Sequence, residues 1–239
     1  MSAYPNSKHA KVLRLISLIS TTHKISLEIT LHSPTGVLYL ACTTPSSRLS
    51  WMPSLLHFNP SGRSTNDYVA TYDPLTSTVT KLKLSGLEEG ISVHGMDVVV
   101  SSENPHELFV YLINHRPFLP IDTVNHKKVG ANSTVEIFKT TVGGSEMVHL
   151  STIYDPDVIV TPNDVLGYPD GKSFYFTNEA SAKTGLVSPP FPWPSSLTHL
   201  TNKYLHTGAN YSHSSPSSLL IHRLLLLLPM QICDSEEYL

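Results

Sequence analysis

The sequence has few cysteines, few basic residues and no long apolar run. Its two cysteines, Cys42 and Cys233, cannot form a zinc cluster by themselves and do not indicate a disulfide-dense scaffold. Whether these two form a single bridge stays open at this point. Sixteen Lys and Arg against nineteen Asp and Glu give a formal net charge of −3, which provides no basic stripe for phosphates. We therefore expect no binding to nucleic acid.

Signals for a membrane or for export are also weak. The longest apolar run, Leu224–Leu228, is far too short to span a bilayer, which takes about 20 residues. The opening stretch, MSAYPNSKHAKVLRLISLIST, carries Lys and Arg inside its apolar part and fits a signal peptide poorly. We expect no transmembrane helix, assign residues 1–24 to no element, and leave the compartment open.

From Glu28 onward, short alternating or apolar runs are separated by turn residues, a pattern typical of β-strands. A loop rich in Ser, Pro and Asn spans residues 43–66. The runs form successive hairpins: 28–32 with 37–43, 67–73 with 77–84, 96–102 with 108–115, 134–141 with 146–154, and 158–168 with 172–178. About ten strands and hardly any helix predict an all-β fold, whether a sandwich, a barrel or a propeller.

The adjacent pair Asn163–Asp164 stands between two strand-like runs of the last hairpin. Its amide oxygen and carboxylate are ligands that a hard cation such as Ca²⁺ accepts. Because successive strand side chains point to opposite faces, the two residues would serve two different sites. The alternative is that Pro-Asn-Asp marks a loop, with both side chains bonded to their own backbone.

Four motifs occur in order along the chain: ISVHGMDVVV (91–100), LFVYLINH (108–115), NSTVEIFK (132–139) and TPNDV (161–165). In this order and spacing they resemble the paraoxonase/arylesterase family of calcium-dependent six-bladed β-propellers, many of which are secreted or membrane-anchored. The resemblance covers about residues 28–179. Four strands make a blade, so the expected fold is a partial six-bladed β-propeller of about two and a half blades over residues 25–185, with irregular segments at both ends.

The resemblance also implies roles for particular residues. Asn163 would bind a catalytic calcium, whereas Asp164 and the backbone carbonyl of Met96 would bind a structural calcium. His94 and His115 match the family's histidine dyad, one as general base and the other orienting it. A neutral imidazole suits this role because its ordinary pKa of about 6.5 leaves it able to accept a proton.

Some of the expected ligands have no match. The family carries a Glu-Asp pair where this chain has Leu27 and Glu28. Leu27 cannot bind a cation, and Glu28 could replace the structural-site Asp only if its longer arm fits. The other catalytic-site ligands have no counterpart in residues 186–239, which are rich in Ser, Pro and Leu and show no strand alternation.

Those last residues are therefore predicted to be a low-complexity extension rather than propeller sequence. They could be a flexible tail, or a mis-spliced or frame-shifted end in place of later blades. The sheet before them would keep an open edge, which predicts self-association.

The implied function is calcium-dependent hydrolysis of aryl esters or lactones, weak or absent in this chain because the catalytic ligands are incomplete. Another class of function remains open: a non-catalytic β-propeller or β-sandwich interaction module. A related six-bladed lactonase or strictosidine-synthase-like fold is a second enzyme alternative.

Overall fold

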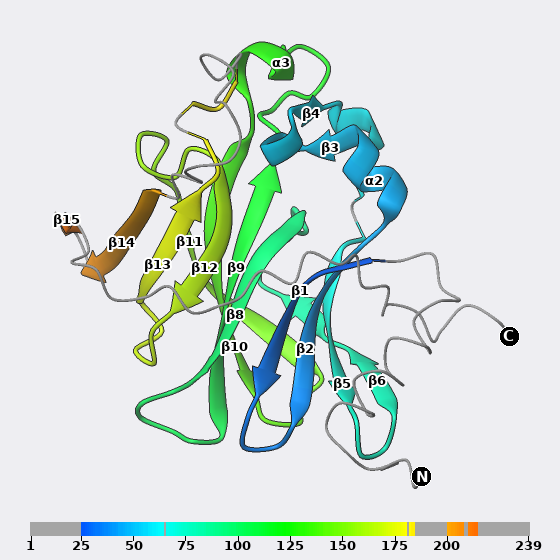
Figure 1. The fold of residues 1–239 in the computed structure, drawn as a ribbon, viewed down its shortest axis with the longest axis vertical. Coiled ribbons are helices and arrows are strands. Elements are labelled where there is room, and N and C mark those ends of the chain that lie inside the picture. The colour runs from blue at the N-terminus through cyan, green and yellow to red at the C-terminus, as the bar shows by residue number, and fades with distance from the viewer. Residues whose placement is uncertain (1–24, 65, 181, 185–199, 208–209, 215–239) are drawn as a thin grey trace, which may run out of the picture.

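The computed structural model describes residues 25–64, 66–180, 182–184, 200–207 and 210–214. These residues form an all-β fold, as predicted, with two short helices among them (Figure 1). No helix in this part of the chain is long and apolar enough to cross a membrane. Residues 1–24 and Cys233 lie outside the described ranges.

The first sheet has the strand order β1-β2-β5-β6, and all its neighbours are antiparallel. The strands are β1 (Ile25–His32), β2 (Val37–Thr43), β5 (Tyr68–Asp73) and β6 (Thr78–Lys81). Gly36 closes the β1–β2 turn at φ +77°, a left-handed conformation that glycine adopts without a Cβ penalty. Both hairpins predicted for this region are confirmed.

A segment between β2 and β5 was predicted to be a loop but contains short elements. They are α2 (Pro45–Ser50), β3 (Trp51–Met52), the 3₁₀ turn η2 (Pro53–Leu55), β4 (His57–Phe58) and the 3₁₀ turn η3 (Pro60–Gly62). The Thr44 hydroxyl caps α2 by accepting a hydrogen bond from the Ser47 amide. Each helical turn starts with proline, whose fixed φ suits the first position.

The second sheet has the strand order β7-β11-β10-β9-β8. Its strands are β7 (Lys83–Ser85), β8 (Val93–Val100), β9 (Glu107–Arg116), β10 (Asn132–Thr141) and β11 (Glu146–Ile153). The short helix α3 (His126–Val129) lies between β9 and β10. Strand β7 continues the chain from the first sheet and pairs parallel with β11, so it links the two sheets.

The third sheet has the strand order β12-β13-β14-β15. Its strands are β12 (Pro162–Gly167), β13 (Ser173–Asn178), β14 (Leu200–Thr207) and β15 (Asn210–Ser214). Because β14 pairs antiparallel with β13, the expectation that residues 186–239 hold no strand is wrong for β14 and β15. A strand edge offers free backbone N–H and C=O groups, and pairing with it does not require an alternating side-chain pattern.

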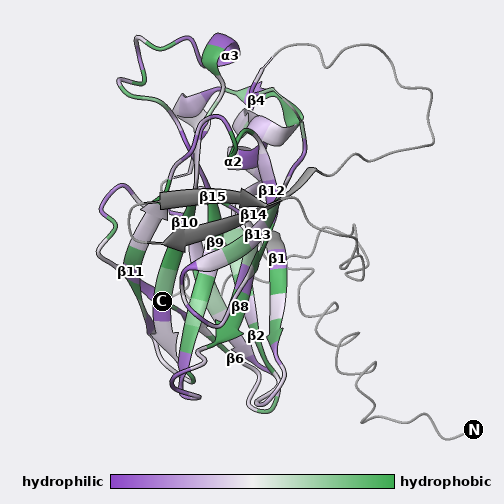
Figure 2. Ribbon diagram, turned by 90° about the vertical axis from the view of Figure 1, so that its left-hand side faces the viewer, coloured by the Kyte–Doolittle hydropathy of each residue, from purple (hydrophilic) through white to green (hydrophobic). Residues whose placement is uncertain are grey.

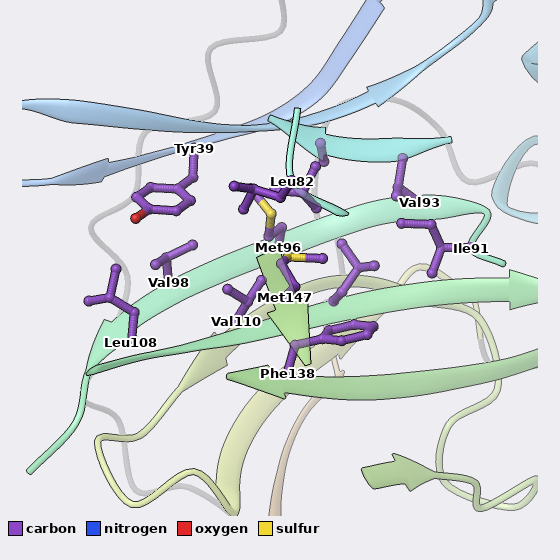
Figure 3. Packing of buried hydrophobic residues seen from close by; sticks show 13 residues of the cluster. Tyr39, Leu82, Ile91, Val93, Met96, Val98, Leu108, Val110, Phe138 and Met147 are labelled. Carbon is purple, nitrogen blue, oxygen red and sulfur yellow. The ribbon is translucent and has the colours of Figure 1, made fainter. Parts of the chain in front are cut away.

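One edge strand of each sheet lies next to the others, with β8 between β1 and β12 (Figure 1). Hydrophobic residues run along these strands and their neighbours (Figure 2). Between the first and second sheets, Tyr39 and Leu82 face Met96 and Val110 in one buried cluster (Figure 3). A second cluster, which includes Tyr111 and Phe174, joins the second and third sheets. Full burial of such side chains contributes roughly 1.5–3 kcal/mol each, so β8 is held firmly from both sides.

Candidate functional site

Each of the three adjacent edge strands, β1, β8 and β12, carries one extra residue relative to its partner strand. The register shifts between Ser26 and Glu28 in β1, between Val93 and Met96 in β8, and between Pro162 and Asp164 in β12. Such β-bulges locally turn a strand and change where its side chains point. The candidate residues predicted from sequence all lie at or beside these bulges or, in the case of His115, on the strand that pairs with β8.

The bulge in β8 brings His94 against His115 of β9. The Nδ1 atom of His94 lies 2.9 Å from Nε2 of His115, and the rings meet edge to face with centroids 5.1 Å apart. On its other side, His115 Nδ1 lies 2.9 Å from the Ser133 hydroxyl on β10. The two histidines predicted as a dyad are therefore in direct contact. Ser133 orients the second ring, although sequence reasoning assigned it no role.

Both imidazoles are buried and neutral at physiological pH. Burial, with a smaller contribution from the nearby Arg48 guanidinium, lowers the pKa of His94 to about 3. Burial, His94 and Arg48 together hold the pKa of His115 well below its ordinary value. A base of such low pKa accepts a proton only weakly at neutral pH. The dyad is thus suited to hydrogen bonding as a neutral pair more than to holding a proton.

The segment between β2 and β5 supports the dyad from one end of the sheets. The Trp51 indole donates a hydrogen bond of 2.8 Å to the backbone carbonyl of His115. Its ring also packs against Phe58 and His126, which ties this segment to α3. No motif in the sequence marked Trp51, because its partner is a backbone atom 64 positions away in the chain.

A buried ion pair anchors the start of β8. Arg48 pairs with Asp67 at 3.2 Å and donates a hydrogen bond to the carbonyl of Val93. Asp67 accepts hydrogen bonds from the Val93 amide at 3.2 Å and the Thr43 hydroxyl at 2.9 Å. Burial raises the pKa of Asp67 and lowers that of Arg48 to about 10, so their attraction does not fully offset the cost of burying both charges.

On the opposite face of β9, a second polar network holds the residue before His115. Asn114 donates to the buried Glu136 carboxylate at 3.1 Å and accepts from the Ser92 amide at 2.8 Å. Glu136 also accepts from the Thr134 hydroxyl at 2.7 Å. This network fixes the end of the β8–β9 ladder, where the dyad lies.

The other side of the bulge meets the pair Asn163–Asp164. A Cβ atom built on Gly95 would lie 2.4 Å from the carbonyl oxygen of Asn163, 2.6 Å from the Cα of Asp164 and 3.1 Å from its Oδ1. Only glycine leaves room for this approach. Asp97 holds the same two strands together further along, since its carboxylate accepts a 3.0 Å hydrogen bond from the Gly167 amide of β12. Residues 94–96 and 163–164 are therefore neighbours in space.

Asn163 and Asp164 would point to opposite faces only in a regular strand. Asn163 instead is the extra residue of the β12 bulge, so strict alternation is interrupted there. Asp164 Oδ1 accepts the amide of Val165 at 2.8 Å, and its own amide bonds the Thr177 hydroxyl at 3.2 Å. The two-residue period of a strand therefore does not assign Asn163 and Asp164 to two different cation sites.

Oxygen atoms of the kind that a hard cation accepts lie on all three edge strands, β1, β8 and β12. The Met96 side chain is fully buried, whereas its carbonyl accepts a 3.1 Å hydrogen bond from the Thr30 hydroxyl of β1. Glu28, two residues before Thr30, bonds the Ile29 amide at 3.3 Å through Oε1. Asp164 lies beside Gly95, the residue before Met96. These oxygen donors suit calcium chemically.

The donors near Asn163 fit a catalytic calcium less well. Within the described ranges there is no group of three or more His, Cys, Asp or Glu side chains that could hold a metal ion. Besides Asn163, the residues predicted from sequence supply no oxygen ligand to a catalytic ion, because Leu27 stands where the resemblance leads one to expect a carboxylate. A comparison of the sequence with protein-family models and with curated proteins finds no match.

Proposed function

We propose that this chain is a paraoxonase/arylesterase-like protein that binds one structural calcium and hydrolyses aryl esters or lactones weakly or not at all. The observation that carries the proposal is the contact of His94 and His115 at 2.9 Å on a bulge that also touches Asn163–Asp164. The motifs carrying the family resemblance are far apart in the chain. Their residues nevertheless lie together, as a shared site requires.

The arrangement of the sheets supports the partial-propeller part of the proposal. Three mainly antiparallel sheets each turn one edge strand toward the others, with β8 between β1 and β12. Blades around a common axis would place their innermost strands in this way. Under the proposal, the three bulges mark the axis, and the candidate residues face it.

Glu28, Asp164 and the Met96 carbonyl would hold the structural calcium. Calcium takes six to eight oxygen ligands with flexible geometry, so water would complete the shell. The longer arm of Glu28 in place of the family's Asp and the Thr30 hydrogen bond to Met96 both weaken the site. We therefore expect stabilisation by calcium in the millimolar range rather than tight binding.

The reaction side of the proposal depends on the dyad. A catalytic calcium, when bound, would polarise the ester carbonyl and stabilise the oxyanion. In this chain, His94 would accept a proton from water at the dyad, while His115 and Ser133 hold its ring in place. The low pKa of His94 makes proton transfer inefficient, which is one reason to expect weak turnover.

Calcium binding is tested by thermal unfolding with millimolar calcium or with chelator. We expect calcium to raise Tm in the wild type and to do so much less in Asp164→Asn, which keeps the shape of the side chain and removes its charge. Asp157→Asn, at an exposed position in the same region, serves as the matched control. An equal calcium response in all three proteins would contradict the structural site.

Hydrolysis of phenyl acetate and a simple lactone tests the second part. We expect no chelator-sensitive activity that clearly exceeds that of a His94→Ala, Asn163→Ala double variant. His106→Ala, at an exposed histidine in the β8–β9 turn, is the control. Strong chelator-sensitive turnover that disappears in the double variant alone would show a complete catalytic site and overturn the expectation of weak activity.

The burial of both histidines favours one second candidate, a non-catalytic interaction module. His115 is fully buried and His94 is 9% exposed, as expected for residues that stabilise a core. An interaction module has no need of calcium. The same thermal experiment therefore separates the two candidates: no calcium response together with no hydrolysis would favour the interaction module.

A further inference from the structure

Three arginines gather at the end of the sheets that carries the dyad. Arg48 and Arg63 come from the segment between β2 and β5, and Arg116 ends β9. The Arg48 side chain is 8% exposed and lies beside Val93, the residue before His94. Burial lowers the pKa of both guanidinium groups, the Asp67 carboxylate raises the pKa of both, and the positive charge of Arg63 also lowers the pKa of Arg48.

Counted over the part of the chain that the structure describes, positive charge exceeds negative charge in this cluster. Arg48 pairs with Asp67 at 3.2 Å, and Arg116 pairs with Glu89 at 3.6 Å. Arg63 is attracted to both carboxylates and repelled by Arg116. Three guanidinium groups therefore share two carboxylates. The Arg48 side chain is largely desolvated and Arg63 is half-buried, so charge that stays unbalanced between them is costly.

Several donors of the cluster are buried and find no hydrogen-bond partner among the residues that the structure describes. They are Nε and Nη1 of Arg48 and Nε of Arg63. Leaving a buried donor unsatisfied is costly, and more so when the group is charged. The excess charge and the unpartnered donors thus occur on the same two side chains.

We propose that Arg48 and Arg63 form a binding site for a small carboxylate anion beside the histidine dyad. One negative charge balances the cluster, whereas a phosphate dianion would exceed what the cluster needs. A carboxylate has two oxygens with about four acceptor positions, so it can bond donors on two separate side chains. Guanidinium groups form strong charge-assisted hydrogen bonds with carboxylates. The site does not depend on hydrolysis or on calcium, although a carboxylate is also the product of ester cleavage.

Titration with acetate tests the site directly. The full chain, labelled with ¹⁵N, is titrated with sodium acetate at constant ionic strength, while the Nε–H resonances of its arginines are followed by NMR. We expect saturable shifts of the Arg48 and Arg63 resonances at acetate concentrations that leave other arginines unchanged. Chloride and phosphate are titrated in parallel. An equal response to all three anions would overturn the carboxylate assignment.

Variants then locate the site. Arg63→Gln should weaken acetate binding about ten-fold, corresponding to about 1.4 kcal/mol, because it removes both the charge and the unpartnered donor. Arg63→Lys keeps the charge and serves as the second variant in case the glutamine form does not fold; it should lose part of the affinity. Lys172→Gln, a single-charge removal in the exposed β12–β13 turn, should bind as the wild type does.

Two results would refute the proposal. One is the absence of saturable acetate shifts at Arg48 and Arg63 in the folded wild type. The other is acetate affinity that falls equally in Arg63→Gln and Lys172→Gln, since that would indicate general charge screening. Neither readout involves ester hydrolysis or calcium, so failure of the hydrolase proposal leaves this test unaffected.

Discussion

Replacing Gly95 by alanine tests the meeting of β8 and β12, on which the candidate site depends. The new methyl group would lie 2.4 Å from the carbonyl oxygen of Asn163 and 2.6 Å from the Cα of Asp164. Both are backbone atoms of a paired strand, so neither can rotate away as the end of a side chain could. One strand must move by a substantial part of an ångström.

The expected cost follows from overpacking. Inserting a methyl group into a packed interface costs about 1–3 kcal/mol, and the rigid contact atoms put Gly95→Ala near the upper end. For a domain of this size, 1 kcal/mol corresponds to about 2–4 °C in Tm. We therefore expect a decrease of roughly 6–12 °C at about 3 kcal/mol, measured by circular dichroism or calorimetry.

Gly143→Ala is a suitable control because it separates steric from backbone effects. Gly143 has φ +74° and nothing within 4 Å of its Cβ position, so its substitution introduces strain without a clash. A residue in a left-handed conformation costs about 1–2 kcal/mol, less than the predicted effect at Gly95. If Gly95→Ala is as stable as Gly143→Ala or more so, β8 and β12 do not approach as described. Residues 94–96 and 163–164 would then not form one site.

Two further predictions concern buried ionisable groups. Asp67→Asn leaves Arg48 without its ionic partner and should destabilise the fold by about 3–5 kcal/mol in urea unfolding; a loss no larger than that of the exposed Asp122→Asn would show that the pair is not buried in solution. The dyad predicts an acid effect: the folded pKa of His94, about 3, is below the ordinary 6.5, so its contribution is complete above pH 6.5 and is lost as pH falls toward 3. Stability should therefore fall less steeply over this window in a His94→Gln, His115→Gln variant than in the wild type, and parallel pH profiles would contradict neutral burial.

Local features of the sequence determined most of the strand pairs. Alternating apolar runs and the turn residues between them specify hairpins, because the two-residue side-chain period and the turn geometry act over a few neighbouring positions. The β1–β2 and β12–β13 hairpins follow this rule. The prediction that no strand follows residue 185 was wrong for β14. That strand pairs with the edge of β13 and does not depend on an alternating pattern of its own.

The site required the tertiary structure. His94 and His115 could be named as candidates, but their 2.9 Å contact depends on a bulge that no local pattern marks. Arg48 lies in the segment predicted to be a loop, and Asp67 follows 19 positions later at the start of a predicted strand. Packing of β8 between two other strands buries these groups, and burial sets their pKa values and leaves arginine donors unpartnered. Desolvation depends on every element around a residue, so no single stretch of sequence contains it.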